Sequence, residues 1–130
     1  MFKEIDHIEI TSRNMEESLK FYTEIIGFKL IRRSKLDGST GITEIAHLSL
    51  GDTRIELLEI PDAAPLPDQP YVGYRMMAII VEDMDSAIKY LREHNVEITR
   101  EPVSMAKSHR GGFRGEFKDN NGVTIEIRQL

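Results

Sequence analysis

The sequence contains no cysteine, and this absence excludes several kinds of site. Without thiols there is no disulfide framework, no thiolate nucleophile and no cysteine-based zinc site. For the same reason, the redox compartment of the protein cannot be read from its cysteine usage.

Positive charge and long apolar runs are also scarce. The 17 lysines and arginines are outnumbered by 22 acidic residues, which gives a net charge of −5 and no basic stripe. We therefore expect neither a nucleic-acid partner nor a membrane partner. No apolar run approaches the length of a membrane span, and Met1 leads directly into an alternating pattern without a signal sequence. These features predict a cytoplasmic protein.

The most informative feature present is an internal repeat. Residues 7–23 align without a gap on residues 76–92, so that Ile10 matches Ile79 and Lys20 matches Lys89. Near the end of each copy, Ile55-Glu56-Leu57 recurs as Ile125-Glu126-Ile127. One module is therefore written twice.

The chain length and the prolines predict how these modules are organised. A chain of 130 residues fits one compact domain that buries roughly two-thirds of its unfolded surface. Four prolines between residues 61 and 70 disfavour helix and central strand there. We expect a single domain over 1–130, with module one at 1–60, a linker at 61–73 and module two at 74–130.

Periodicity predicts the elements of module one. Asn14 and Glu17 form an N-x-x-E variant of the capping box, and Gly27 ends the helix. Gly51-Asp52 is a tight turn between the last two strands. The predicted order is βαβββ, with strands at Phe2–Thr11, Phe28–Arg33, Thr43–Leu50 and Thr53–Ile60, and the helix from Asn14 to Gly27.

Module two repeats this order. Asp83 or Asp85 caps its helix, and Asp119-Asn120-Asn121-Gly122 supplies its last turn. Residues 101–111 fit no regular element and suggest a loop near a cleft. The predicted strands are Arg75–Val81, Val96–Thr99, Gly112–Lys118 and Val123–Gln129, with the helix at about Asp83–His94.

Strand alternation places three potential metal-binding residues on the sheet faces that lie opposite the helices. Where Ile55 and Ile125 lie beneath the helices, His7, Glu56 and Glu126 lie on the opposite face. A histidine nitrogen and two carboxylates suit a divalent ion such as zinc, nickel, manganese, cobalt or iron. The alternative is an ordinary solvated face, which residue types alone favour. The repeat of the glutamate in both copies favours a site.

The repeat and its motifs resemble a known family. The paired modules, the opening Asp6-His7-Ile8, the segment from Ser18 to Phe28 and the two Ile-Glu endings are similar to the vicinal oxygen chelate superfamily. This superfamily includes glyoxalases, bleomycin-resistance proteins and extradiol dioxygenases. The resemblance implies an α+β glyoxalase-like fold, in which tandem βαβββ modules form a metal- or ligand-binding cleft, and a homodimer.

The same resemblance implies a ligand set with one departure. By position, His7, Glu56 and Glu126 match three metal ligands, while Met76 stands where the family usually has a second histidine. A single matching histidine disfavours a ring-cleaving dioxygenase, which uses two. Thr11 and Ile60 replace the arginine and asparagine with which glyoxalase I contacts glutathione. The resemblance therefore does not favour a glutathione-dependent lyase.

Local motifs are closer to methylmalonyl-CoA epimerase. Gly41-Ile42-Thr43-Glu44-Ile45 and the segment from Gly51 to Glu59 carry this likeness. It implies that Glu44 acts as a catalytic base and that Glu126 is a metal ligand that can also serve as the opposing acid or base. The alternative for Glu44 is an exposed charge on an edge strand.

Other candidate residues concern substrate binding. Met76 is a packing residue beside a bound metal, a weak soft ligand, or the wall of an apolar pocket that holds no metal. His47 can replace the missing imidazole if the strand register allows. His109 and Arg110, with Lys107, can bind an anionic group or form an ordinary solvated loop.

These observations lead to two hypotheses of different classes. The first is a metal-dependent lyase or isomerase, similar to an epimerase, that moves a proton next to a carbonyl of a small metabolite. The second is a metal-free protein of the bleomycin-resistance type, which binds or sequesters a small molecule. The sequence identifies neither the substrate nor the metal.

Overall fold

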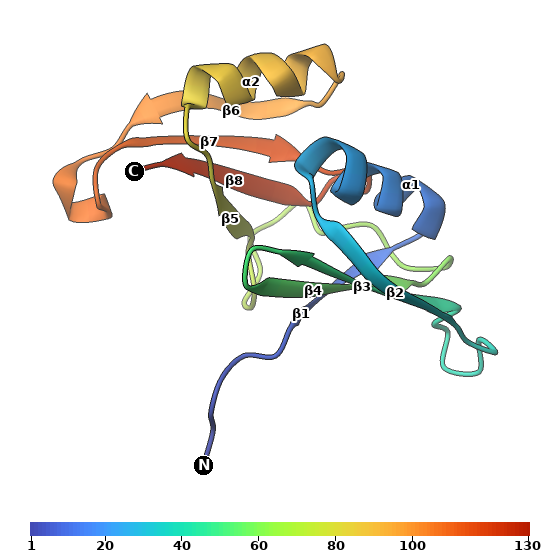
Figure 1. Cartoon of the computed structure of the whole chain (residues 1–130). Coiled ribbons are helices and arrows are strands. Elements are labelled where there is room, and N and C mark those ends of the chain that lie inside the picture. Colours follow the sequence, from blue (N-terminus) through green and yellow to red (C-terminus); the bar gives the residue numbers. More distant parts are fainter. The chain divides into compact units, whose positions relative to one another are not determined.

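The computed structural model describes residues 1–130, with the side chain of Ser108 left aside. The chain forms two compact units, unit 1 from Met1 to Pro65 and unit 2 from Leu66 to Leu130 (Figure 1). The boundary falls within the predicted linker. Among the described residues, no helix has both the length and the apolar character needed to cross a membrane.

Unit 1 is a four-stranded sheet with a helix on one face (Figure 1). The strand order is β1-β4-β3-β2, in which β1 runs parallel to β4 and the other neighbours are antiparallel. The elements are β1 (Ile8–Ser12), α1 (Met15–Lys20) with its π-helical continuation (Phe21–Ile26), β2 (Lys29–Lys35), β3 (Glu44–Leu50) and β4 (Thr53–Glu59).

Unit 2 has the same topology, with strand order β5-β8-β7-β6. Its elements are β5 (Met77–Ile80), α2 (Met84–Glu93), β6 (Ile98–Ser104), a short 3-10 turn (Lys107–His109), β7 (Phe113–Lys118) and β8 (Thr124–Gln129). Again only the first and last strands of the unit pair in parallel. The predicted tandem βαβββ architecture of an α+β protein is thus confirmed.

Each sheet buries the side that the apolar alternation predicted. In unit 1, Ile55 and Leu57 of β4 are buried with Met15 and Leu19 of α1. In unit 2, Ile125 of β8 is fully buried, and the buried residues of α2 are Met84, Ile88 and Leu91. The opposite faces carry polar side chains such as Glu56 and Glu126, together with apolar ones such as Leu58 of β4, which is also buried.

Local signals explain where the helices begin and end. The side chain of Asn14 accepts a hydrogen bond from the Glu17 N–H at 3.0 Å, and Gly27 ends the helix with a φ of +98°. The second half of the predicted capping box is replaced, because the Asn14 N–H donates to Ser12 Oγ. In unit 2, Asp83 rather than Asp85 is the cap.

The largest errors in the predicted strand boundaries are at the first strand and at β6. The first strand begins at Ile8 rather than at Phe2, because its pairing with β4 starts at Ile8, opposite Ile55. Phe2 is left 96% exposed. The strand β6 continues through Pro102, which is tolerated because β6 is an edge strand with an irregular register there.

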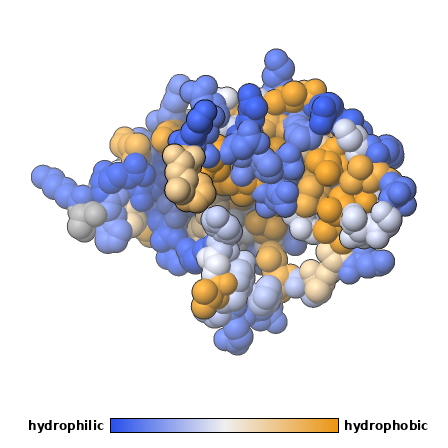
Figure 2. All heavy atoms as spheres, turned by 90° about the horizontal axis from the view of Figure 1, so that it is seen from below, coloured by the Kyte–Doolittle hydropathy of each residue, from blue (hydrophilic) through white to orange (hydrophobic). Residues whose placement is uncertain are grey.

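The surface of the chain is mixed in polarity. On the face drawn in Figure 2, apolar side chains lie exposed among hydrophilic ones. Across the chain, exposed large apolar residues are numerous in segments outside the sheets, including Phe2, Ile5, Val72 and Tyr74.

One side chain in each unit ties the end of the last strand to the start of the helix. In unit 1, Glu59 accepts the Met15 N–H at 2.7 Å and the Thr43 hydroxyl at 2.6 Å. In unit 2, Gln129 accepts the Met84 N–H at 2.7 Å. The two hydrogen bonds to Glu59, first from Thr43 and then from Met15, lower the pKa of its carboxyl group.

Glu59 should therefore make stability depend on pH. Because its pKa is lower in the folded protein, ionised Glu59 stabilises the fold above the ordinary value of 4.5. This contribution is lost as the pH falls through the lowered pKa. Glu59→Ala should reduce the free energy of unfolding at pH 7 by about 1 kcal/mol. Glu59→Gln, which introduces the residue type that unit 2 has at Gln129, should reduce the free energy of unfolding by less than Glu59→Ala does. Below pH 4.5, the stability of Glu59→Gln should fall less than that of the parent protein. Urea unfolding at several pH values measures both, and identical pH profiles for Glu59→Gln and the parent protein would contradict this assignment.

Candidate metal centre

The sheet face of unit 1 opposite α1, called the open face here, carries a line of four polar side chains. The register pairs Glu9 of β1 with Glu56 of β4, Glu56 with His47 of β3, and His47 with Arg32 of β2. The line therefore crosses all four strands and changes from acidic to basic along its length.

Glu56 lies between two imidazoles on the open face. His7 Nε2 is 3.4 Å from Glu56 Oε2, and His47 Nδ1 is 3.1 Å from Glu56 Oε1. The Glu56 side chain is 14% exposed, and the two histidines are about one-third exposed. The structure thus brings His7 and Glu56 together, and the strand register brings His47 to Glu56 as well.

Asp6 orients the ring of His7. Asp6 Oδ2 lies 2.6 Å from His7 Nδ1. A proton on Nδ1 that is donated to Asp6 leaves the lone pair of Nε2 directed at Glu56 and Glu9. Asp6, and after it the charge of Glu56, raise the pKa of His7. In return, the hydrogen bond to His7 lowers the pKa of Asp6.

The donors on the open face fit a divalent metal ion. One ligand atom each from His7, Glu9 and Glu56 lie within 4.8 Å of one another. A neutral imidazole with two carboxylates is a common ligand set for zinc and other first-row ions and leaves coordination positions free. The sequence-based ligand set omitted Glu9, which lies two residues after His7 and therefore on the same side of an extended chain.

The equivalent position in unit 2 has different chemistry. Glu126 Oε2 accepts a hydrogen bond from Arg114 Nε at 2.7 Å, and Arg128 lies 3.8 Å from its other oxygen. The residue paired with Glu126 across the ladder is Glu116, where unit 1 has His47. The charge of Glu126 is thus balanced within unit 2, and its role as a metal ligand stays a prediction.

The structure does not bring Glu44 to the open face. Glu44 is 2% exposed and shares the helix-covered side of β3 with Ala46 and Leu48. Its oxygens accept hydrogen bonds from Arg33 Nε at 2.7 Å and from Arg33 Nη2 at 3.1 Å. The expectation of an exposed edge charge was wrong, because β3 is a central strand. The ion pair with Arg33 also leaves Glu44 on the opposite side of the sheet from His7 and Glu56.

The remaining candidates lie in unit 2. Met76 directly precedes β5, and its sulfur is 3.7 Å from Arg75 Nη1. His109 and Arg110 lie on the exposed loop before β7, next to Lys107. Arg128 Nη2 donates to the carbonyls of His109 and Gly111, which holds this loop against β8. Substrate binding by Met76, His109 and Arg110 stays a prediction.

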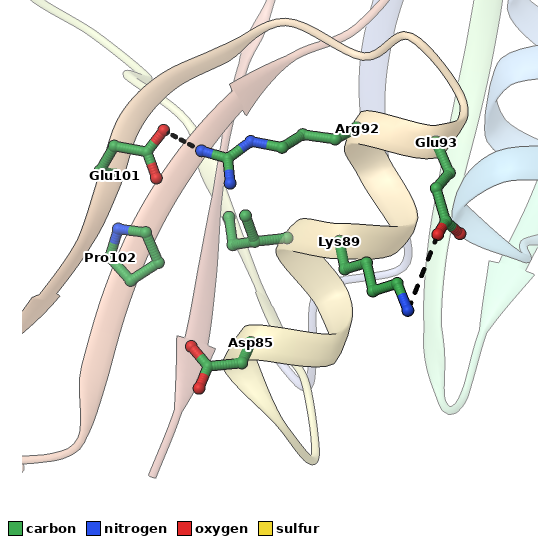
Figure 3. A pocket seen from close by; sticks show the side chains of 7 residues that line it. Asp85, Lys89, Arg92, Glu93, Glu101 and Pro102 are labelled. Atoms are coloured by element: carbon green, nitrogen blue, oxygen red, sulfur yellow. Dashed lines mark hydrogen bonds and ion pairs between the residues drawn. The ribbon is translucent and has the colours of Figure 1, made fainter.

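A further cavity lies away from this site. A cavity of about 530 Å³ lies between α2 and β6 in unit 2 (Figure 3). Arg92 pairs there with Glu101, and Lys89 with Glu93 at 3.9 Å. Because its charged groups largely neutralise one another and no histidine lines it, this cavity is a weaker candidate than the open face.

Comparison with known proteins agrees with the fold. The chain is 32% identical over 130 residues to the uncharacterized protein YaeR of Escherichia coli, covering 96% of this chain and 95% of YaeR. It is 31% identical over 146 residues to 2-epi-5-epi-valiolone epimerase of an Actinomyces species, covering 97% and 79%. The crystal structure of a glyoxalase family protein from Enterococcus faecalis superimposes with a TM-score of 0.84 at 26% identity, covering 98% of both chains.

A family model covers nearly the whole chain. Residues 4–127 match the model described as Glyoxalase/Bleomycin resistance protein/Dioxygenase superfamily. The match includes both modules and every residue of the open-face line. The chain therefore belongs to the glyoxalase, bleomycin resistance protein and dioxygenase superfamily.

Proposed function

We propose that the protein is a metal-dependent lyase or isomerase that moves a proton next to a carbonyl group of a small metabolite. The observation that carries this proposal is the cluster of His7, Glu9 and Glu56, whose ligand atoms lie within 4.8 Å of one another. These residues would hold a divalent ion such as zinc, nickel, manganese, cobalt or iron. A bound ion would polarise the carbonyl and make the neighbouring C–H bond more acidic.

His47 is the proton acceptor that the open face offers. Its Nδ1 lies 3.1 Å from Glu56 Oε1, so that a proton on Nδ1 is held by the carboxylate and the lone pair of Nε2 is free. An imidazole oriented by a carboxylate is a common arrangement for a general base. We therefore favour His47 over Glu44 for this role, while Glu126 remains the predicted opposing acid or base.

The epimerase among the relatives supports this class of reaction. An epimerisation next to a carbonyl requires removal of a proton and its return on the other face, which needs an acid and a base near the activated carbon. The homodimer implied by the family resemblance is part of the proposal, and light scattering on the purified protein measures it. A cytoplasmic location stays a prediction from the sequence.

Exchange of a substrate proton with solvent tests the proposed reaction. In D2O, the protein loaded with Co²⁺ or Zn²⁺ should catalyse incorporation of deuterium next to the carbonyl in some members of a panel of 2-oxo acids, hydroxyketones and acyl thioesters. His47→Ala should slow the exchange by about 100-fold or more while retaining the metal. Exchange at the parent rate in His47→Ala would exclude this base, and exchange that persists without metal would contradict metal dependence.

A second candidate function is supported by the chemistry of unit 2. Met76 replaces a histidine, and Glu126 is bound by Arg114. Both features fit a protein that binds or sequesters a small molecule without a metal. Absence of bound metal after incubation with zinc, nickel and manganese, together with saturable binding of an apolar compound, would favour this function.

A further inference from the structure

A small cavity lies beside the metal-binding cluster in unit 1. It has a volume of about 220 Å³, and its lining includes His7 and His47 together with Arg32 and Arg54. This volume is below the range of about 300–1,000 Å³ that is typical of sites for drug-sized ligands. The cavity therefore suits a small metabolite.

The two arginines of this cavity have no partner of opposite charge. Neither Arg32 nor Arg54 forms an ion pair or a hydrogen bond with the residues described here. The charge of Arg54 acts on Asp6, but the Oδ2 atom of Asp6 is engaged with His7 at 2.6 Å. Asp6 also lines the cavity, but its carboxylate is engaged with His7, so that neither guanidinium group has a carboxylate paired with it.

A β-bulge places Arg32 at this cavity. The register of β2 with β3 shifts between Leu30 and Arg32, so that Arg32 lies opposite His47 and Arg33 lies opposite Ala46. Without the extra residue, Arg32 would lie opposite Ala46 on the helix-covered side. The irregularity therefore sends one arginine to Glu44 in the core and its neighbour to the open face.

The line across the open face separates two kinds of binding chemistry. Glu56 and Arg32 stand two strands apart, which corresponds to about 10 Å between their backbones. The acidic end offers metal ligands, and the basic end offers guanidinium groups, with His47 between them. A molecule with a chelating carbonyl at one end and an anionic group at the other matches this order.

We propose that Arg32 and Arg54 bind an anionic group of the substrate, either a carboxylate or a phosphate. Guanidinium groups bind both kinds of oxyanion through paired charge-assisted hydrogen bonds. The carbonyl end of the same molecule then lies toward His7 and Glu56, with His47 next to the carbon between the two ends. That the ligand is a substrate rests on the proposed function, whereas the anion site itself does not.

The anion site is tested on the full chain after removal of metal with a chelator. The protein is titrated by NMR with malonate, inorganic phosphate and, as the uncharged control, malonamide. Malonate or phosphate should cause saturable shifts at Arg32, His47 and Arg54. Arg32→Gln and Arg54→Gln should each weaken the binding about tenfold or more. Tighter binding of malonate indicates a carboxylate, and tighter binding of phosphate a phosphate group.

Lys20→Gln is the matched control, because Lys20 is an exposed residue of α1 on the other side of the sheet. It should leave anion binding unchanged. The proposal is overturned by shifts that do not saturate, by equal binding of malonamide, or by equal weakening in Lys20→Gln. The metal content of the same proteins is measured separately, and Arg32→Gln should bind metal as the parent protein does. A parent protein without affinity for metal would contradict the proposed function but would not affect the result on anion binding.

Discussion

Replacing His7 with alanine is expected to lower the affinity of the protein for Co²⁺ or Zn²⁺ by roughly 100-fold or more. His7 supplies the one nitrogen donor of the cluster with Glu9 and Glu56. Without it, the cluster retains carboxylates only, which bind borderline ions less strongly. Calorimetric titration at alkaline pH measures the change, because the raised pKa of His7 makes protonation compete with metal binding at lower pH.

His94→Ala is the control for this experiment. His94 caps the C-terminus of α2, and its Nδ1 is 2.8 Å from the carbonyl oxygen of Tyr90. Its removal deletes an imidazole without touching the open face and should leave metal affinity unchanged. Equal losses in His7→Ala and His94→Ala would show that the metal binds elsewhere. Glu126→Gln tests the third ligand predicted from the sequence, and a loss equal to that of Glu56→Gln would add Glu126 to the set.

The second large effect is expected in the core of unit 1. Arg33→Met should reduce the free energy of unfolding by roughly 3 kcal/mol or more, because it leaves a buried carboxylate without its main partner. The Glu44 side chain is 3% exposed, and the nearest remaining cation is Lys35 at 3.9 Å. The hydrogen bonds to Glu44 and then to Glu16 raise the pKa of Arg33, so its guanidinium group stays charged throughout the usual pH range.

The neighbouring residue provides the control. Arg32→Met removes the same group from the open face and should change the free energy of unfolding by no more than about 0.5 kcal/mol. The double variant Arg33→Met with Glu44→Met should recover part of the loss, because no unpaired carboxylate remains. Urea unfolding compares the three proteins. Equal stability of Arg33→Met and Arg32→Met would refute the buried ion pair and return Glu44 to the list of catalytic candidates.

The sequence was sufficient for features that depend on periodicity and repetition. Alternation of apolar residues predicted that Ile55 and Ile125 are buried, and the repeat predicted that both units share one topology. Asn14 and Gly27 marked the helix because capping depends on local geometry. In these cases, the physical cause lies within a few residues of its effect.

Features that depend on the pairing of distant strands could not be predicted. The side of the sheet occupied by Arg32 and Arg33 depends on a bulge, for which the local sequence has no clear signal. The pairing of Glu44 with Arg33 follows from that register. Glu9 is two residues from His7 and so shares its side of the strand, but the ligand set implied by the family resemblance contains Glu126 rather than Glu9.

The central claim is that His7, Glu9 and Glu56 bind a divalent ion, and anomalous X-ray diffraction at the cobalt edge tests it most directly. Crystals of the full chain grown with Co²⁺ should show an anomalous peak for an ion within bonding distance of His7 Nε2 and of the carboxylates of Glu9 and Glu56. The same map shows whether Glu126 contributes a ligand. A map with no peak at His7, or with a peak only at other residues, would contradict the account.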